Sequence, residues 1–131
     1  MSRSRDDRGA VSLGQMVVIA PALLFGLMLI VQAGLYFHAR NVAEQAAQEG
    51  AAEARAFDGD EASAKQRAMT FLGALGDRAL TDRNVEVDRG AETATVTVSG
   101  DVISLVPGVS WSVSESASGP VERYVPPTGG Q

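Results

Sequence analysis

The sequence lacks cysteine and has one histidine among its 131 residues. The absence of cysteine excludes disulfides, thiolate metal sites and cysteine-based catalysis. A single histidine leaves little for acid–base or metal chemistry that relies on imidazole. Basic residues are also few, because 11 Lys and Arg stand against 16 Asp and Glu, which gives a net charge of −5. Nucleic-acid binding needs a clustered basic face, so the acidic balance excludes it as the main activity.

Charge of either sign is absent from residues 9–39, where the apolar residues gather. Within this run, residues 16–37 read MVVIAPALLFGLMLIVQAGLYF, which as a helix would rise roughly 33 Å. That length matches the hydrocarbon core of a bilayer, which is about 30 Å thick. The alternative is a cleaved secretory signal, whose apolar region is only about 7–15 residues long. We therefore predict a retained, single-pass transmembrane helix.

The charges that flank the run predict its orientation. Arg3, Arg5 and Arg8 precede it, and Arg40 is the single opposing charge directly after it. Positive flanks stay on the cytoplasmic side. The sequence thus favours a cell-membrane protein with a cytoplasmic N-terminus and an extracytoplasmic C-terminal head.

Small residues and one proline interrupt the apolar run. Pro21 removes a backbone donor and predicts a kink. Ala22, Gly26 and Gly34 follow at intervals of four and eight residues, and would permit close packing against another helix. Glycine and proline are also more common in membrane helices generally, so a packing role and background composition both remain open.

Helical character continues beyond the apolar run. Alanines recur at spacings of three and four, which predicts one long helix from about residue 10 to about residue 56. Asp58 and Glu61 have the spacing of a capping box, ahead of a second helix over about 60–75. Gly76 follows as a C-cap. The alanine stripe suits packing against a sheet or against neighbouring copies.

After Gly76 the apolar period changes to two, which predicts short antiparallel strands. Strands are expected over 85–88, 93–99 and 109–114, with a short apolar piece over 102–106 before the Pro107-Gly108 turn. The fold class is therefore α+β, with a three- to four-stranded antiparallel sheet. Trp111 is expected to anchor the sheet by sharing one buried face with Val109 and Val113. The predicted core of the head comprises Phe71, Leu72, Val96, Val98 and Trp111.

No group of residues in the sequence has the spacing of a catalytic, cofactor or metal site. The acidic segment at Asp58 hints at a calcium loop, but Ala62 and Met69 occupy the fifth and twelfth positions, where oxygen ligands are needed. Glu49 and Glu53 read as a solvated helix face. We expect no enzymatic activity, no cofactor and no small-molecule substrate. The predicted divisions are a basic leader (1–9), the transmembrane helix (10–39), its extracytoplasmic extension (40–57), a small α+β head (58–124) and a disordered tail (125–131).

The N-terminal half carries a family resemblance. The segment DRGAVS at 7–12 precedes the apolar run with its internal proline, GLYFHAR follows at 34–40, and QEGA lies in the alanine-rich helix at 48–51. In this it resembles the TadE-like proteins of bacterial tight-adherence pilus systems, which are Flp-type and type IV-related. The segment SLVPGVSWSVSESASGPVER at 104–123 is similar to actinobacterial members.

The resemblance implies a pilin-like head on a membrane helix and a structural, non-enzymatic role as a minor pilin, pseudopilin or pilus-assembly protein. It implies cleavage between Gly9 and Ala10 by a prepilin peptidase. It also implies membrane lipid and other pilin or Tad assembly subunits as partners. Members of the family carry Glu at the fifth mature position, whereas this sequence has Gly14. The alternative function is a signal-anchored extracytoplasmic binding module unrelated to pili.

Overall fold

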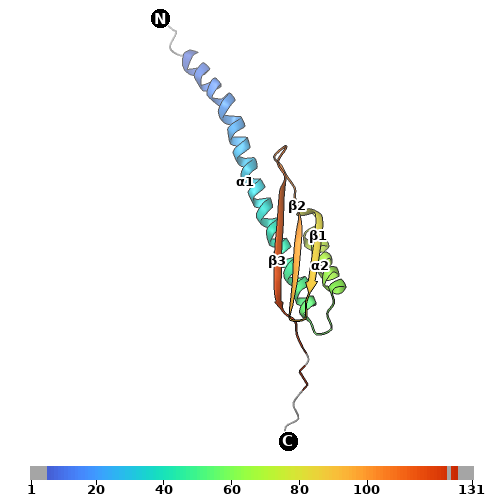
Figure 1. Ribbon diagram of the computed structural model, residues 1–131. Coiled ribbons are helices and arrows are strands. Elements are labelled where there is room, and N and C mark those ends of the chain that lie inside the picture. Colours follow the sequence, from blue (N-terminus) through green and yellow to red (C-terminus); the bar gives the residue numbers. More distant parts are fainter. Residues whose placement is uncertain (1–5, 124, 127–131) are drawn as a thin grey trace.

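The computed structural model describes residues 6–123 and 125–126, and over these residues the chain forms two helices and one three-stranded antiparallel sheet. The sheet packs against the C-terminal half of the first helix, whose N-terminal half projects away from the head (Figure 1). The predicted α+β fold with a long N-terminal apolar helix is therefore confirmed. The elements are α1 (Asp6–Arg55), α2 (Glu61–Leu75), β1 (Leu80–Arg89), β2 (Thr93–Val102) and β3 (Trp111–Pro120).

The long helix α1 is continuous from Asp6 to Arg55 and runs through Pro21 without a break. Its two halves differ in what they contact. The N-terminal half carries exposed apolar side chains, whereas the C-terminal half buries alanines against the sheet and α2. The prediction of one long helix, apolar first and amphipathic afterwards, is confirmed. Of the two packing partners expected for the alanine stripe, the sheet of the same chain is the one observed.

The start of α2 differs from the predicted capping box. Asp60, not Asp58, is the N-cap, and its carboxylate accepts from the Ser63 backbone N–H at 2.6 Å while the Ser63 hydroxyl accepts from the Asp60 N–H at 3.3 Å. The Ser63 backbone N–H also lowers the pKa of Asp60. Asp58 is not the N-cap because it lies in a turn over residues 56–59. The Gly59 N–H closes this turn by donating to the carbonyl of Ala56 at 3.0 Å. At the other end, Gly76 caps the helix as predicted.

The strands are longer than the sequence pattern indicates, and they pair in the order β1-β2-β3. A short loop around Gly90 joins β1 to β2, as expected. The apolar piece predicted over 102–106 is not a further strand, because β2 ends at Val102 and residues 103–110 form a loop. In that loop the Val109 N–H donates to the Val106 carbonyl at 3.3 Å, and Gly108 has φ +76°. This is the geometry of a type II turn with Pro107 at its first central position.

The core of the head is built largely from small side chains. Alanines of α1 and α2 pack against valines of β1 and β2, so the two helices approach the sheet closely. Of the predicted core residues, Leu72, Val96 and Val98 are buried, and Phe71 packs against the core while partly exposed. Among the residues whose burial the structure describes, the buried apolar ones are Ala39, Val42, Ala43, Ala46, Ala47, Ala51, Ala54, Ala64, Ala68, Leu72, Ala79, Leu80, Val85, Ala94, Val96, Val98, Val102 and Val113.

Trp111 does not anchor this core, contrary to the prediction. It is 37% exposed at the first position of β3 and packs beside Tyr36. Val113 is buried, whereas Val109 precedes the strand and is exposed. The alternation of apolar residues correctly indicates which face of β3 is turned toward α1. It does not indicate how far along α1 each of these residues lies. Trp111 lies at the end of the sheet that is nearest the apolar half of the helix.

Two arginines of β1 close the C-terminal ends of the two helices. Arg89 donates from Nε to the Ala54 carbonyl at 2.8 Å and from Nη2 to the Ala56 carbonyl at 3.4 Å. Arg83 donates from Nη1 to the Leu72 carbonyl at 3.1 Å. Carbonyls in the last turn of a helix have no partner within the helix, so Arg89 satisfies an Ala54 carbonyl that would otherwise need water. The Leu72 carbonyl also accepts from the Gly76 N–H at 2.7 Å, so Arg83 is its second donor. The two arginines also tie β1 to both helices.

Candidate membrane interface and its junction with the head

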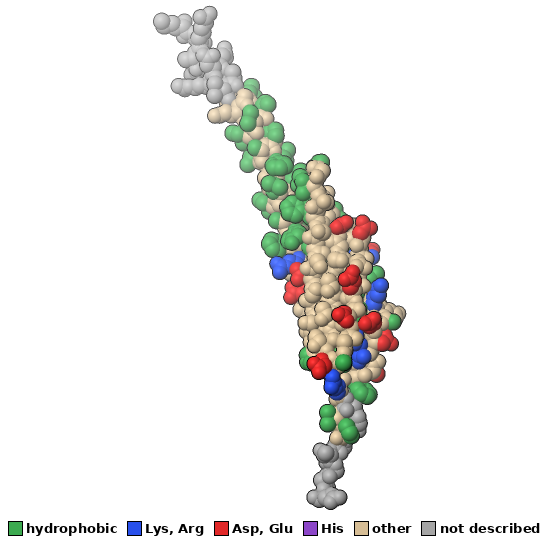
Figure 2. All heavy atoms as spheres, in the orientation of Figure 1, with side chains coloured by type: hydrophobic (Ala, Val, Ile, Leu, Met, Phe, Trp, Pro, Cys, Tyr) green, Lys and Arg blue, Asp and Glu red, His purple; other side chains and the backbone are tan. Residues whose placement is uncertain are grey.

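The N-terminal half of α1 has the length and composition of a membrane span. Among the residues that the structure describes, one helix meets these criteria, and almost none of its most apolar stretch is buried by the rest of the chain. The uncharged run 9–39 would rise roughly 45 Å, enough for the hydrocarbon core and both interfacial layers. Apolar side chains cover this half in Figure 2. The large exposed ones are Leu13, Met16, Val17, Val18, Ile19, Leu23, Leu24, Phe25, Leu27, Leu29, Ile30, Val31 and Phe37.

The small residues of the span contact nothing large in this chain. A Cβ added at Gly14, Gly26 or Gly34 would meet no atom within 4 Å, apart from the helix itself. Pro21 and Ala22 are exposed. Close packing at these positions therefore requires another molecule and stays a prediction. Gly9 and Ala10, the residues of the expected cleavage site, lie in the first turns of α1.

Gln32 ties the apolar, N-terminal half of α1 to the head. Its Nε2 donates to the Ile103 carbonyl at 3.2 Å, and its Oε1 accepts from the Leu105 N–H at 2.7 Å. The side chain is only 2% exposed, although the helix around it is largely uncovered. A buried amide with both ends paired satisfies the rule for polar groups in apolar surroundings. This pair of hydrogen bonds, termed the Gln32 clamp, holds the 103–110 loop against the helix.

Three aromatic residues lie next to the Gln32 clamp. The ring of Tyr36 makes edge-to-face contacts with Phe37 and Trp111, with ring centroids 5.9 Å and 6.2 Å apart. Between α1 and Trp111 is a small apolar hollow of about 150 Å³, which is also lined by Leu29 and Ala33. Tyrosine and tryptophan are enriched where membrane proteins cross the bilayer–water boundary. Their position here is consistent with that boundary.

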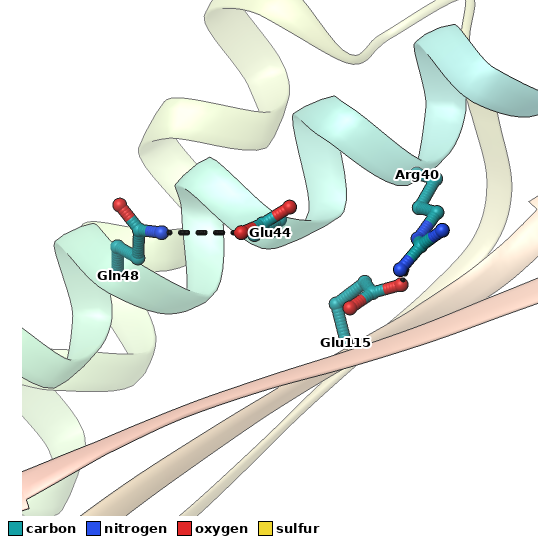
Figure 3. Close-up of polar contacts among 4 residues, drawn as sticks. All are labelled: Arg40, Glu44, Gln48 and Glu115. Atoms are coloured by element: carbon teal, nitrogen blue, oxygen red, sulfur yellow. Dashed lines mark hydrogen bonds and ion pairs between the residues drawn. The ribbon is translucent and has the colours of Figure 1, made fainter.

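One ion pair marks the polar side of the junction. Arg40 Nε lies 2.7 Å from Glu115 Oε1, with the two side chains pointing at each other from α1 and β3 (Figure 3). This hydrogen bond raises the pKa of Arg40 above its usual value. One turn further along α1, Gln48 Nε2 donates to Glu44 at 3.5 Å. The junction therefore passes from apolar to charged within eight residues, from Gln32 to Arg40.

Sequence reasoning missed the Gln32 clamp. The available signal was that Gln32 is the single Asn or Gln between Met16 and Phe37. A lone amide in a membrane run usually has a partner, because an unpaired one costs free energy in hydrocarbon. The partner could not be found, since Ile103 and Leu105 are 71 and 73 residues further along the chain.

Replacing Gln32 by leucine is expected to free the 103–110 loop. The Leu105 N–H and the Ile103 carbonyl would lose their partners, and leaving a buried polar group unpaired costs about 1–3 kcal/mol. Amide exchange at Leu105, measured by mass spectrometry on the full chain in detergent micelles, should become about tenfold faster or more. Gln45→Leu, at an exposed position of the same helix, is the matched control. Unchanged exchange at Leu105 in the Gln32 variant would show that the clamp does not hold the loop.

Comparison with known proteins agrees with the resemblance in the N-terminal half. Residues 9–52 match the family described as TadE-like protein. The matched segment comprises the span, the Gln32 position and most of the alanine stripe of α1. No curated protein and no solved structure gives a significant match to the chain. The chain thus contains a TadE-like N-terminal region, followed by a head for which the comparisons identify no relative.

Proposed function

We propose that this chain, whose residues 9–52 are TadE-like, is a membrane-anchored structural component of Tad (Flp-type) pilus biogenesis. It acts as a minor pilin or pilus-assembly protein and has no enzymatic role. Its N-terminus lies in the cytoplasm and its head lies outside the membrane, as the arginines before the span favour. Its partners are membrane lipid and other pilin or Tad assembly subunits.

The observation that carries this proposal is that the TadE-like segment and α1 coincide. The family match begins in the first turns of α1 and ends within its alanine stripe. One continuous helix therefore contains an apolar half that the chain leaves uncovered and a half that forms the base of the head. Such an element places the head at a fixed height and rotation relative to the span, which suits a subunit that assembles side by side with others.

Processing is part of the proposal. The short basic leader ends at Gly9, directly before the apolar helix, which is the expected position for a prepilin peptidase to cut. Gly14 stands where the family has Glu, so a new N-terminus at Ala10 would find no carboxylate at that position on a neighbouring copy. An unpaired charge in apolar surroundings is costly. We infer that the protein is cleaved but enters filaments poorly, which places its main role at the assembly site.

The test is pilus production by a strain whose own copy of the gene is deleted and then replaced by variants. Gly26→Leu adds bulk where this chain leaves open space, so it can disturb only contacts with other molecules. We expect it to reduce surface pili in sheared fractions by about tenfold, which corresponds to the loss of about 1.4 kcal/mol at a helix contact. Leu27→Ala, which removes bulk at the adjacent exposed position, is the control and should retain pili. Normal piliation in the deletion strain would refute the proposed function.

A further inference from the structure

The loop between β2 and β3 exposes apolar side chains and carries no charge. Residues 102–114 contain no Asp, Glu, Lys or Arg. Ile103, Leu105, Val109 and Trp111 are 43, 40, 42 and 37% exposed. The 103–110 loop together with Trp111 is termed the apolar tip. Large apolar side chains gathered at one end of an otherwise charged head indicate a surface that something covers.

The apolar tip lies alongside the membrane half of α1. The Gln32 clamp joins Ile103 and Leu105 to a helix position eight residues before Arg40, which is about 12 Å along the helix axis. In Figure 1 the β2–β3 loop extends from the head toward the N-terminal end of α1, and in Figure 2 apolar side chains continue from the helix onto that end of the head. If the charge of Arg40 stays in the aqueous or headgroup layer, the apolar tip lies deeper than that layer.

Four backbone groups of the apolar tip have partners within the chain, which lowers the cost of bringing the loop to an apolar layer. The Ile103 carbonyl and the Leu105 N–H are held by Gln32. The Val106 carbonyl accepts from the Val109 N–H at 3.3 Å and from the Ser104 hydroxyl at 2.9 Å. These contacts remove polar groups that would otherwise need water. Leaving them unpaired in an apolar layer would cost several kcal/mol per group.

We propose that the apolar tip inserts into the interfacial layer of the bilayer, so that the head contacts the membrane at a second place beside its helix. The occupant is lipid, because the apolar tip is continuous with the span and lies at the depth of Gln32. Tyr36, Phe37 and Trp111 form the aromatic layer at this boundary. The charges nearest the loop in sequence stay on the aqueous side: Asp101 pairs with Ser112 next to the loop, and Glu115 lies four residues further along β3 than Trp111. Two contacts instead of one restrict the tilt of the head on the membrane. The proposal rests on the membrane span, and not on a role in pili.

Trp111 is the only tryptophan in the sequence, so the native chain reports on the apolar tip directly. The full-length protein would be reconstituted in phosphatidylcholine vesicles without any other protein. Tryptophan emission would then be measured with lipids brominated high on the acyl chains and, separately, with aqueous iodide. We expect the brominated lipid to reduce Trp111 emission by about half and iodide to have little effect, as for an interfacial indole.

Two reporter variants, each combined with Trp111→Phe, provide the controls. Phe57→Trp places the indole at the far end of the head, beyond the end of α1, where iodide and not lipid should quench it. Leu24→Trp places the indole on the exposed face of the span, where lipid should quench it. Quenching of Trp111 by iodide alone, with the Leu24→Trp reporter quenched by lipid, would overturn the proposal and leave the apolar tip to a protein partner. Failure of lipid to quench the Leu24→Trp reporter would overturn the span itself and the proposal with it.

Discussion

Replacing Leu72 by alanine is expected to destabilise the head by about 3 kcal/mol, within the 2–5 kcal/mol range for buried Leu→Ala changes. Leu72 is fully buried and is among the largest side chains in a core composed mainly of alanine and valine. The helices and the sheet around Leu72 are closely packed, so they cannot move far into the space that the truncated side chain would leave. The head together with the helix extension that packs on it comprises about 80 residues, which gives roughly 4–12 kcal/mol of stability in total. One truncation would therefore remove a large fraction of it.

The measurement is chemical denaturation of the full chain in detergent micelles, followed by far-ultraviolet circular dichroism. Leu75→Ala is the matched control, because Leu75 lies one turn further along α2 and is 58% exposed. The free energy of unfolding of the control should lie within about 0.5 kcal/mol of that of the parent chain, as is usual for surface substitutions. If the two variants have the same free energy of unfolding, α2 does not pack on the core in the way described here.

Gly50→Leu is expected to have a comparable or larger effect for the opposite reason, since it adds volume where none is available. Gly50 lies where α1, α2 and β2 meet. A Cβ at this position would lie 3.0 Å from Val96 Cγ1, 3.2 Å from the Ala64 carbonyl oxygen and 3.2 Å from Ala68 Cβ. The three further carbons of leucine could be placed only by separating α2 or β2 from α1. Overpacking typically costs about 1–3 kcal/mol, and we expect the upper end of that range or more.

The same denaturation assay separates crowding from helix propensity. Gly50→Ala gains about 0.8–1 kcal/mol of helix propensity against a contact that is only slightly too close, so its net change should be small. Gly73→Leu is the control for the larger side chain, because an added Cβ there meets nothing within 4 Å. That variant should be as stable as the parent or more so. A Gly50→Leu chain as stable as the Gly73→Leu chain would show that the contact of α1 with α2 and β2 is looser than described.

These two expectations also bear on function. The alanine stripe and Gly50 let α1 lie close to the sheet, and the TadE-like segment includes that part of the helix. A variant that loosens the helix from the sheet would also loosen the Gln32 clamp, which belongs to the same helix. Loss of pili in such variants would then follow from the head's stability. Gly26 is the better probe of contacts between subunits because it has no role in packing within the chain.

The sequence by itself determined the features that depend on neighbouring residues. The uncharged run set the length of the apolar helix, and the alanine spacing extended that helix to the end of α1. Gly76 and the Pro107-Gly108 turn were identifiable because glycine and proline act on their own backbone. The N-cap of α2 lies two residues later than the capping-box spacing predicts, since two aspartates compete there and the turn over 56–59 decides between them.

Only the tertiary structure decided which distant residues meet. Periodicity indicates which face of a strand or helix is buried, but not the height at which two elements pack against each other. That height placed Trp111 beside Tyr36 instead of in the head core, and it brought Ile103 and Leu105 to Gln32 across more than 70 residues. The candidate interface is formed by these contacts. Their partners are specified by how α1 and the sheet pack together, which no local pattern in the chain encodes.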